Sequence, residues 1–265
     1  MPISGIPLFQ LFGIQVYLHW TWFIVAMLEY QRTKAYGSPI WNMAEYIALF
    51  GIVLTHEFGH ALACRSVGGT ADRILLWPLG GVAFVSPPQR PGATLWSIAA
   101  GPLVNVILVP VTLGLAYFSG TLHEGFPFNP PVSNGQSFAQ MLFLINLTLL
   151  IFNMLPIYPL DGGQILRSIL WFFIGPIRSL LIASVIGLVG AGLGVLLALF
   201  LGDMWLVVMA AFAAMQSWAG FLRARAMGMM DRMNRMNRPQ PDFVSTQYPV
   251  QSDSQPLSWR DPNQP

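Results

Sequence analysis

The chain has 265 residues, of which 54% are hydrophobic and only 9% are charged, and its net charge is +2. Because soluble domains carry roughly 25% charged residues, this composition excludes an ordinary soluble protein. It predicts a polytopic α-helical membrane protein with about six transmembrane helices. The net charge is too small to indicate nucleic-acid binding. The single cysteine, Cys64, excludes an intrachain disulfide and a zinc site built from several cysteines.

The first third of the chain predicts strands as well as helices. Residues 12–18 alternate between apolar and polar or small side chains, which favours a β-strand. Residues 19–30 are expected to form a hydrophobic helix that is short for a membrane span. A second helix is expected over residues 41–67, before two glycines. Residues 74–85 contain two β-type runs around a Pro-Leu-Gly-Gly turn, so they predict a membrane-associated hairpin packed against the helices.

The rest of the membrane region is helical in pattern. Hydrophobic segments predict helices over residues 93–118, 137–155, 164–174, 177–201 and 204–222. Pro156 and Pro159 interrupt this series, and a helix broken at membrane depth is typical of places where polar groups line a site. Residues 1–222 are therefore the predicted membrane domain. Residues 223–265 are predicted to form a basic juxtamembrane segment, with a short interfacial helix, and then a disordered cytoplasmic tail.

One motif within the second helix predicts metal chemistry. Residues 56–60 read His-Glu-Phe-Gly-His. Positions i and i+4 share one face of an α-helix, so His56 and His60 can bind the same metal ion. Glu57 then lies beside that ion, where a carboxylate can take a proton from water. Because ionisable groups in an apolar helix are costly unless they are paired or bound to metal, we predict a catalytic zinc site.

A catalytic zinc ion usually has three protein ligands, so a third ligand is needed. Asp161 lies in the broken helix before two glycines, which allow close approach of the backbone. Asp161 could be this ligand, or it could cap the N-terminus of the following helix. Other candidates lie near helix ends or too far along the same helix, and they are Cys64, His19, His123, Glu29, Glu45 and Asp203.

Two further motifs are Gly-Pro-Leu-Val-Asn at residues 101–105 and Asn-Met-Leu-Pro-Ile-Tyr-Pro-Leu-Asp-Gly-Gly at residues 153–163. With residues 56–60, in this order, they resemble the site-2 protease family of intramembrane zinc metalloproteases. The resemblance covers about residues 10–222. It is strongest to the six-helix branch without a PDZ domain. That branch often has C-terminal CBS modules, which we do not expect in residues 223–265.

The resemblance implies roles for particular residues. One zinc ion per chain would be bound by His56, His60 and Asp161, and Glu57 would activate water. Asn105 and Asn153 would help to bind the substrate or the oxyanion. The implied partners are membrane-anchored protein substrates, cleaved within or near the lipid bilayer, and no nucleic acid. The resemblance leaves the oligomeric state open.

Other functions are compatible with a zinc site in a membrane helix. One is a membrane zinc protease of another type, against which the Asn-Pro-Asp-Gly arrangement argues. Another is a zinc transporter, or an inactive relative that binds transmembrane partners. Glu57 distinguishes these alternatives, because a transporter needs metal ligands but no general base beside the first histidine.

The arginines predict the orientation in the membrane. They gather around alternate loops and after the last helix, at Arg65, Arg73, Arg90, Arg167, Arg178, Arg223, Arg225, Arg232, Arg235 and Arg238. Only Arg32 and Lys34 fall on the opposing side. The positive-inside rule then puts both termini in the cytoplasm, and the zinc site in the cytoplasmic half of the cytoplasmic membrane.

Overall fold

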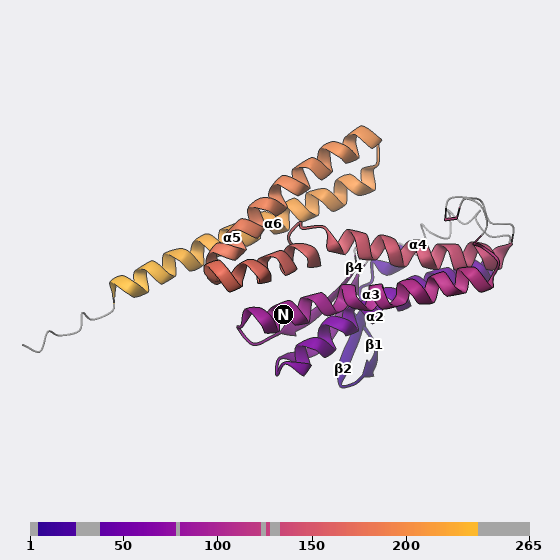
Figure 1. The fold of residues 1–265 in the computed structure, drawn as a ribbon, viewed down its shortest axis with the longest axis horizontal. Helices are drawn as coiled ribbons and strands as arrows, with labels where there is room; N and C mark the ends of the chain where they lie inside the picture. The colour runs from indigo at the N-terminus through magenta and orange to yellow at the C-terminus, as the bar shows by residue number, and fades with distance from the viewer. Residues whose placement is uncertain (1–4, 25–37, 78–79, 123–125, 128–132, 238–265) are drawn as a thin grey trace, which may run out of the picture. The chain divides into compact units, whose positions relative to one another are not determined.

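The computed structural model describes residues 5–24, 38–77, 80–122, 126–127 and 133–237. Residues 1–228 form one compact unit, in which long helices accompany a small β-sheet (Figure 1). The predicted first helix, residues 19–30, lies mostly outside the described residues, and only residues 22–24 of it are seen as helical.

The sheet has four strands in the order β1-β2-β3-β4. The strands are β1 (Ile6–Leu11), β2 (Ile14–Leu18), β3 (Thr70–Trp77) and β4 (Gly80–Ser86). The two hairpins, β1-β2 and β3-β4, are antiparallel, and β2 joins β3 in parallel. This confirms the predicted strand within residues 12–18 and the predicted hairpin over residues 74–85. In this order β4 is an edge strand.

The sheet packs on the helix that carries the metal motif. Ile14 and Val16 of β2 and Ile74 and Leu76 of β3 are fully buried and belong to one core cluster with Phe58 of that helix. Their spacing of two residues places them on a single face of the sheet. Each buried aliphatic side chain stabilises the fold by about 1.5–3 kcal/mol. The packing therefore fixes the hairpin β3-β4 beside the metal motif.

Five described helices are long and apolar enough to cross a membrane. They are α2 (Pro39–Ser66), α3 (Pro91–Phe118), α4 (Asn134–Met154), α5 (Asp161–Leu201) and α6 (Met204–Met236). A capping box formed by Ser133 and Gln136 begins α4. Within α5 the backbone is non-helical at Gly175, before Pro176. This kink is the break predicted between the helices over residues 164–174 and 177–201.

The last helix is longer than its predicted range of residues 204–222. The arginine-rich segment after Leu222 continues α6 to Met236 instead of forming a separate interfacial helix. The reason is local, because residues 223–236 are rich in alanine, methionine and arginine, which favour helix, and contain no proline. The predicted disordered tail lies outside the described residues from residue 238 onward.

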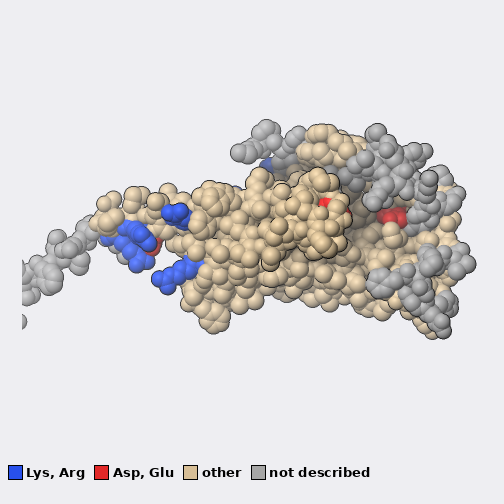
Figure 2. All heavy atoms as spheres, turned by 90° about the horizontal axis from the view of Figure 1, so that it is seen from above, with Lys and Arg blue, Asp and Glu red and all other residues tan. Residues whose placement is uncertain are grey.

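The surface of the described residues is strongly apolar. Figure 2 shows one face, on which nearly all described atoms belong to uncharged side chains. Large side chains such as Phe118, Phe173 and Phe200 are more than 80% exposed, at 86%, 81% and 87%. Apolar surface on this scale is unfavourable in water and favourable in lipid. The chain is therefore an integral membrane protein.

Candidate metal centre

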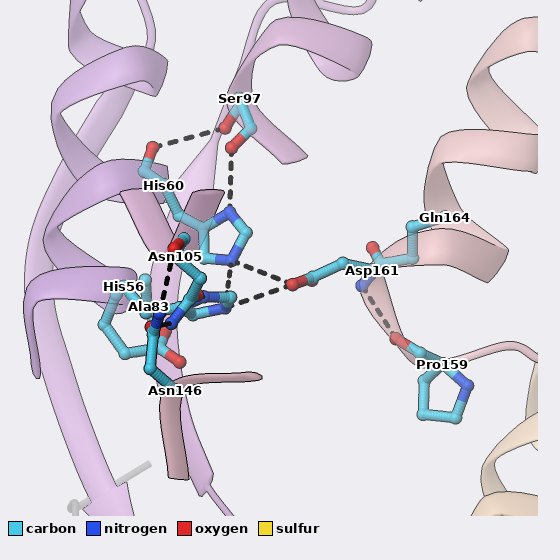
Figure 3. Close-up of polar contacts among 10 residues, drawn as sticks. His56, His60, Ala83, Ser97, Asn105, Asn146, Pro159, Asp161 and Gln164 are labelled. Carbon is cyan, nitrogen blue, oxygen red and sulfur yellow. Dashed lines mark hydrogen bonds and ion pairs between the residues drawn. The ribbon is translucent and has the colours of Figure 1, made fainter. Parts of the chain in front are cut away.

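Three ligand atoms from two helices converge on one point (Figure 3). The His56 Nε2 and His60 Nε2 atoms are 3.1 Å apart. The Asp161 Oδ2 atom lies 3.1 Å from the first and 3.4 Å from the second. Ligands held about 2.0–2.2 Å from a tetrahedral zinc ion are themselves about 3.3 Å apart. The triangle formed by these three atoms therefore has the size that zinc requires.

Residues of helix α3 contact the Nδ1 atoms of both histidine rings and so fix the orientation of the rings. Ser97, Gly101 and Asn105 are four residues apart, so they form one face of α3. The His60 Nδ1 atom donates to the Ser97 carbonyl oxygen at 2.9 Å, and His56 Nδ1 lies 2.5 Å from Asn105 Oδ1. A side chain on Gly101 would collide with the His60 ring, since its Cβ would lie 2.2 Å from Nε2. Both rings thus turn Nε2 toward Asp161.

A pair of buried asparagines sets the proton position on His56. The Asn146 Nδ2 atom donates to the Asn105 backbone oxygen at 3.0 Å, which leaves Asn146 Oδ1 to accept from Asn105 Nδ2 at 2.8 Å. Asn105 Oδ1 is then directed at His56 and can only accept a hydrogen bond. The proton of a neutral His56 ring is therefore on Nδ1, and Nε2 keeps its lone pair.

These hydrogen bonds test whether the residues fit a metal ion. The Ser97 carbonyl oxygen can only accept, so a neutral His60 also carries its proton on Nδ1. Asp161 Oδ2 is buried, and no hydrogen-bond donor from the described residues reaches it. Two nitrogen lone pairs and a carboxylate oxygen thus face one another, an arrangement that a shared cation satisfies. The set of two imidazoles and one carboxylate is typical of catalytic zinc.

A tightly packed loop places Asp161. The predicted N-cap alternative is wrong, because Leu160 occupies the N-cap position of α5 and the Asp161 side chain faces the histidines. A Cβ on Gly162 would lie 2.4 Å from the Met154 carbonyl oxygen. The end of α4 therefore folds directly over the start of α5. Gln164 Nε2 closes the turn by donating to the Pro159 carbonyl oxygen at 2.9 Å.

The carboxylate of Glu57 is held by the sheet. Its Oε2 atom accepts a hydrogen bond from the Ala83 backbone nitrogen of β4 at 2.8 Å. A Cβ on Gly81 would lie 2.2 Å from Glu57 Cγ, so this strand position requires glycine. The hairpin that packs on α2 therefore also orients the predicted general base.

A cavity of about 350 Å³ adjoins these groups. His56, Glu57, His60 and Asp161 all line it. Asn153 at the end of α4 lines the cavity as well, whereas Asn105 is fully buried behind His56. Apolar side chains form most of the remaining wall and include Val53, Trp77, Val82, Val85, Ile98, Leu149 and Phe212.

The other candidate ligands lie elsewhere. Cys64 is buried under β3, with its Sγ atom 3.5 Å from the Thr70 carbonyl oxygen. His19 contacts Thr21 through Nδ1 at 2.6 Å, and Asp203 caps α6 by accepting from the Leu206 backbone nitrogen at 3.2 Å. Among the described residues, only His56, His60 and Asp161 form a group of potential ligands that lie close enough together to bind one metal ion. Two further candidates, His123 and Glu29, lie outside the described residues.

Two site residues were not anticipated from the sequence. Ser97 acts through its backbone oxygen, which no side-chain pattern reveals. Asn146 is fully buried and could have been found, because it lies seven residues before Asn153 and so shares its face of α4.

We expect Asn105→Leu to lower zinc affinity about 10- to 100-fold, because partners that orient a metal-binding histidine contribute on that scale. The variant leaves His56 free to turn and removes the acceptor that fixes its proton. Competition with a chelating dye in detergent measures the affinity. Thr112→Val is the control on the same helix, since the Thr112 hydroxyl donates to the Leu108 and Val109 carbonyl oxygens of α3 itself. An unchanged zinc affinity of Asn105→Leu would show that Asn105 does not orient His56 for metal binding.

Comparison with known proteins agrees with this geometry. The profile of peptidase family M50 matches residues 44–131 and 129–199. A zinc metalloprotease of Methanocaldococcus jannaschii is 34% identical over 69% of this chain. A relative from Synechocystis is 30% identical over 86% of this chain. The solved structure of the site-2 protease from Methanocaldococcus jannaschii superposes with a TM-score of 0.57 at 27% identity, covering 82% of this chain and 95% of that one.

The two relatives are longer than the matching region. The chain spans 50% of the Methanocaldococcus jannaschii relative and 62% of the Synechocystis relative. The structural match confirms the predicted fold class of membrane helices with a small sheet.

Proposed function

Because this chain belongs to peptidase family M50, the site-2 protease family that its motifs resemble, we propose that it is an intramembrane zinc metalloprotease. Its substrates would be membrane-anchored proteins, whose peptide bonds it hydrolyses. The observation that carries this proposal is the placement of Glu57 in one cavity with the three converging ligand atoms of His56, His60 and Asp161. A transporter or an inactive binding protein would need the ligands but not a carboxylate anchored beside them.

Each residue has a proposed role in this chemistry. When bound by His56, His60 and Asp161, zinc would supply a Lewis acid that acidifies water and polarises a carbonyl. Glu57 would take the proton from water and later deliver it to the leaving amine. Asn153 lines the cavity and would donate a hydrogen bond to the carbonyl oxygen. The side-chain amide of Asn105 is hydrogen-bonded to His56 and Asn146. We therefore propose that Asn105 positions His56 and does not bind the substrate.

The edge of β4 provides a place for the substrate. A transmembrane helix hides its carbonyl groups in its own hydrogen bonds, so it must unwind before it can be cleaved. The Ala83 N–H points to Glu57 and therefore away from β3. Because this direction alternates along a strand, the backbone groups of Gly81 and Val85 also face the open edge. The unwound segment could pair with this edge as an added strand.

We expect Val85→Pro to lower cleavage of a helical substrate about tenfold, because proline removes one edge N–H that an added strand would use. The inward bonds to β3 are kept, so folding and zinc content should be retained. Cleavage of a reconstituted transmembrane peptide measures the effect. Val85→Ala, which changes the same side chain but keeps the backbone N–H, is the control and should retain cleavage. Equal cleavage by Val85→Pro and the wild type would count against strand addition.

The orientation of the chain decides which side receives the products. We propose that both termini are cytoplasmic, as the arginine distribution indicates. His60 then lies about 10 Å from the cytoplasmic end of α2 at 1.5 Å per residue. Water would reach the site from the cytoplasm, and cleavage would release fragments there.

Cysteine labelling in cells tests this orientation on a Cys64→Ser background. We expect Gln251→Cys to react only with membrane-permeant reagents and Thr121→Cys to react with impermeant ones, since they flank opposite ends of the spans. The reverse pattern would invert the proposed topology and the side of release.

The substrates can be sought directly. Glu57→Gln should bind a substrate without cleaving it, so membrane proteins captured on this variant are candidates. Each captured protein is then incubated with the wild-type protein and with Glu57→Gln. Zinc-dependent cleavage by the wild type alone supports the proposed function, and cleavage by neither contradicts it.

A further inference from the structure

The cavity has polar side chains beyond the metal ligands and Glu57. They are Asn153, Gln164 and Gln216. Gln164 is used within the protein, where it donates to the Pro159 carbonyl oxygen at 2.9 Å. Within the described part of the chain, the side-chain amides of Asn153 and Gln216 make no such hydrogen bond. An amide on an apolar membrane helix is unfavourable without a partner, which makes it a candidate for ligand binding.

The position of Gln216 is fixed relative to the metal centre. Gln216 and Phe212 are four residues apart on α6, and both line the cavity. The next residue, Ser217, donates its hydroxyl to the Tyr158 carbonyl oxygen, in the loop that leads to Asp161. One turn further on, a Cβ on Gly220 would lie 2.9 Å from the Tyr158 ring. The loop that supplies the metal ligand therefore also anchors α6.

The cavity lies where the sheet and α6 meet. Trp77 at the end of β3 contacts Phe212 of α6, with ring centroids 5.2 Å apart. The cavity wall includes residues of β4 and residues of α6. A peptide held in this space would therefore have β4 available to it and also the amide of Gln216.

A substrate strand that pairs with β4 still has backbone groups with which β4 cannot form hydrogen bonds. Successive residues of an extended chain direct their N–H and C=O groups to alternate sides. Pairing with β4 satisfies one side only. The groups on the other side face a cavity wall made mostly of apolar side chains, against which unpaired backbone groups are costly. A side chain with both a donor and an acceptor can satisfy them, and Gln216 has both.

We propose that Gln216 binds the substrate backbone, by pairing with a peptide group that faces away from β4. The ligand is an unwound apolar segment, recognised through its backbone and not its side chains. This inference rests on the proposed function, because it takes a peptide as the occupant of the cavity. It leaves Asn153 for the carbonyl oxygen of the bond that is cleaved.

The test is a binding experiment that needs no hydrolysis. The probe is a synthetic transmembrane peptide of about 20 apolar residues with a central glycine-rich segment, which lowers the cost of unwinding. In a series of peptides, each central peptide bond in turn is replaced by an ester, which removes one N–H group. Binding is measured in nanodiscs to zinc-loaded Glu57→Gln, with and without Gln216→Met. Met215→Leu is the control, since Met215 is 61% exposed on α6.

We expect Gln216→Met to weaken binding of the all-amide peptide about five- to tenfold, as one hydrogen bond requires. One ester should weaken binding similarly when Gln216 is present and have no effect in Gln216→Met. Esters at bonds facing β4 should act equally in both proteins. The proposal would be overturned if the all-amide peptide bound equally tightly to Glu57→Gln with and without Gln216→Met. It would also be overturned if each ester had the same effect on binding in these two proteins.

The ester series also tests the proposal without any change at Gln216. If Gln216 serves one side and β4 the other, two adjacent central bonds must both be sensitive. Sensitivity at every second bond only would show that β4 acts alone and would overturn the role of Gln216. Failure of the proposed function would look different, since the all-amide peptide would then bind but would not be cleaved by the protein that retains Glu57.

Discussion

Replacement of Glu57 by glutamine is expected to leave zinc binding near one ion per chain and to abolish peptide hydrolysis. Glutamine keeps the size of the side chain and can still accept the hydrogen bond from the Ala83 nitrogen. It cannot take a proton from water, and loss of a general base typically costs about 10²- to 10⁴-fold in rate. Zinc content by elemental analysis and cleavage of a reconstituted substrate measure the two effects.

The matched control is Glu45→Gln on the same helix. Glu45 lies about three turns before His56 and does not line the cavity, so cleavage should be retained. Two results would contradict the assignment of Glu57. One is turnover by Glu57→Gln equal to that of the wild type. The other is loss of zinc from Glu57→Gln, which would make Glu57 a ligand instead of a base.

The elements of the fold could be predicted where their signal is local. Proline and glycine mark the break before Asp161 and the kink at Gly175, and apolar periodicity marks the helices. The parallel pairing of β2 with β3 could not be predicted, because it joins two hairpins far apart in the sequence. The extent of α6 was underestimated for another reason. The arginines after Leu222 change the polarity of the chain but not its preference for helix.

Within the site, the metal-binding side chains could be predicted from the sequence. Helical spacing alone predicts that His56 and His60 share a metal ion. The position of Asp161 in the broken helix was compatible with a ligand or an N-cap, and the resemblance to the site-2 protease family favoured the ligand. The hydrogen bonds that orient them were not predictable in the same way. Ser97 contributes a backbone oxygen, and the pairing of Asn105 with Asn146 depends on how α3 packs against α4. Contacts of this kind join different helices, so they leave no regular spacing of residues within one segment of the sequence.

The second half of the chain contributes to the metal centre from a distance. A Cβ on Gly190 of α5 would lie 2.7 Å from the Ile157 side chain, and one on Gly187 would lie 2.9 Å from the Tyr158 backbone. Ser217 of α6 holds the same loop through the Tyr158 carbonyl oxygen. Small residues in α5 and α6 thus allow the loop before Asp161 to pack closely. Their importance is visible only once the helices are assembled.

We expect Asp161→Ala to lower zinc affinity by on the order of 10²-fold or more, because it removes one of three ligands and the only negative charge among them. Its Oδ2 atom lies within 3.4 Å of both histidine nitrogens, and no other acidic residue in the described ranges joins that cluster. Water could fill the vacated position, but two neutral imidazoles alone hold zinc weakly. Elemental analysis after dialysis and competition with a chelating dye measure the loss.

Asp203→Ala controls for the removal of a carboxylate elsewhere, since Asp203 caps α6 and should not affect zinc. The Asp161→Ala protein should remain folded, because the loop is held by Gln164 and Ser217 and not by the carboxylate. Retention of full zinc by Asp161→Ala, together with its loss from Glu45→Ala, would show that the third ligand has been misassigned. Loss of zinc from Asp161→Ala alone would leave a protein that still contains Glu57 but has no metal to activate water, and it should not cleave peptides.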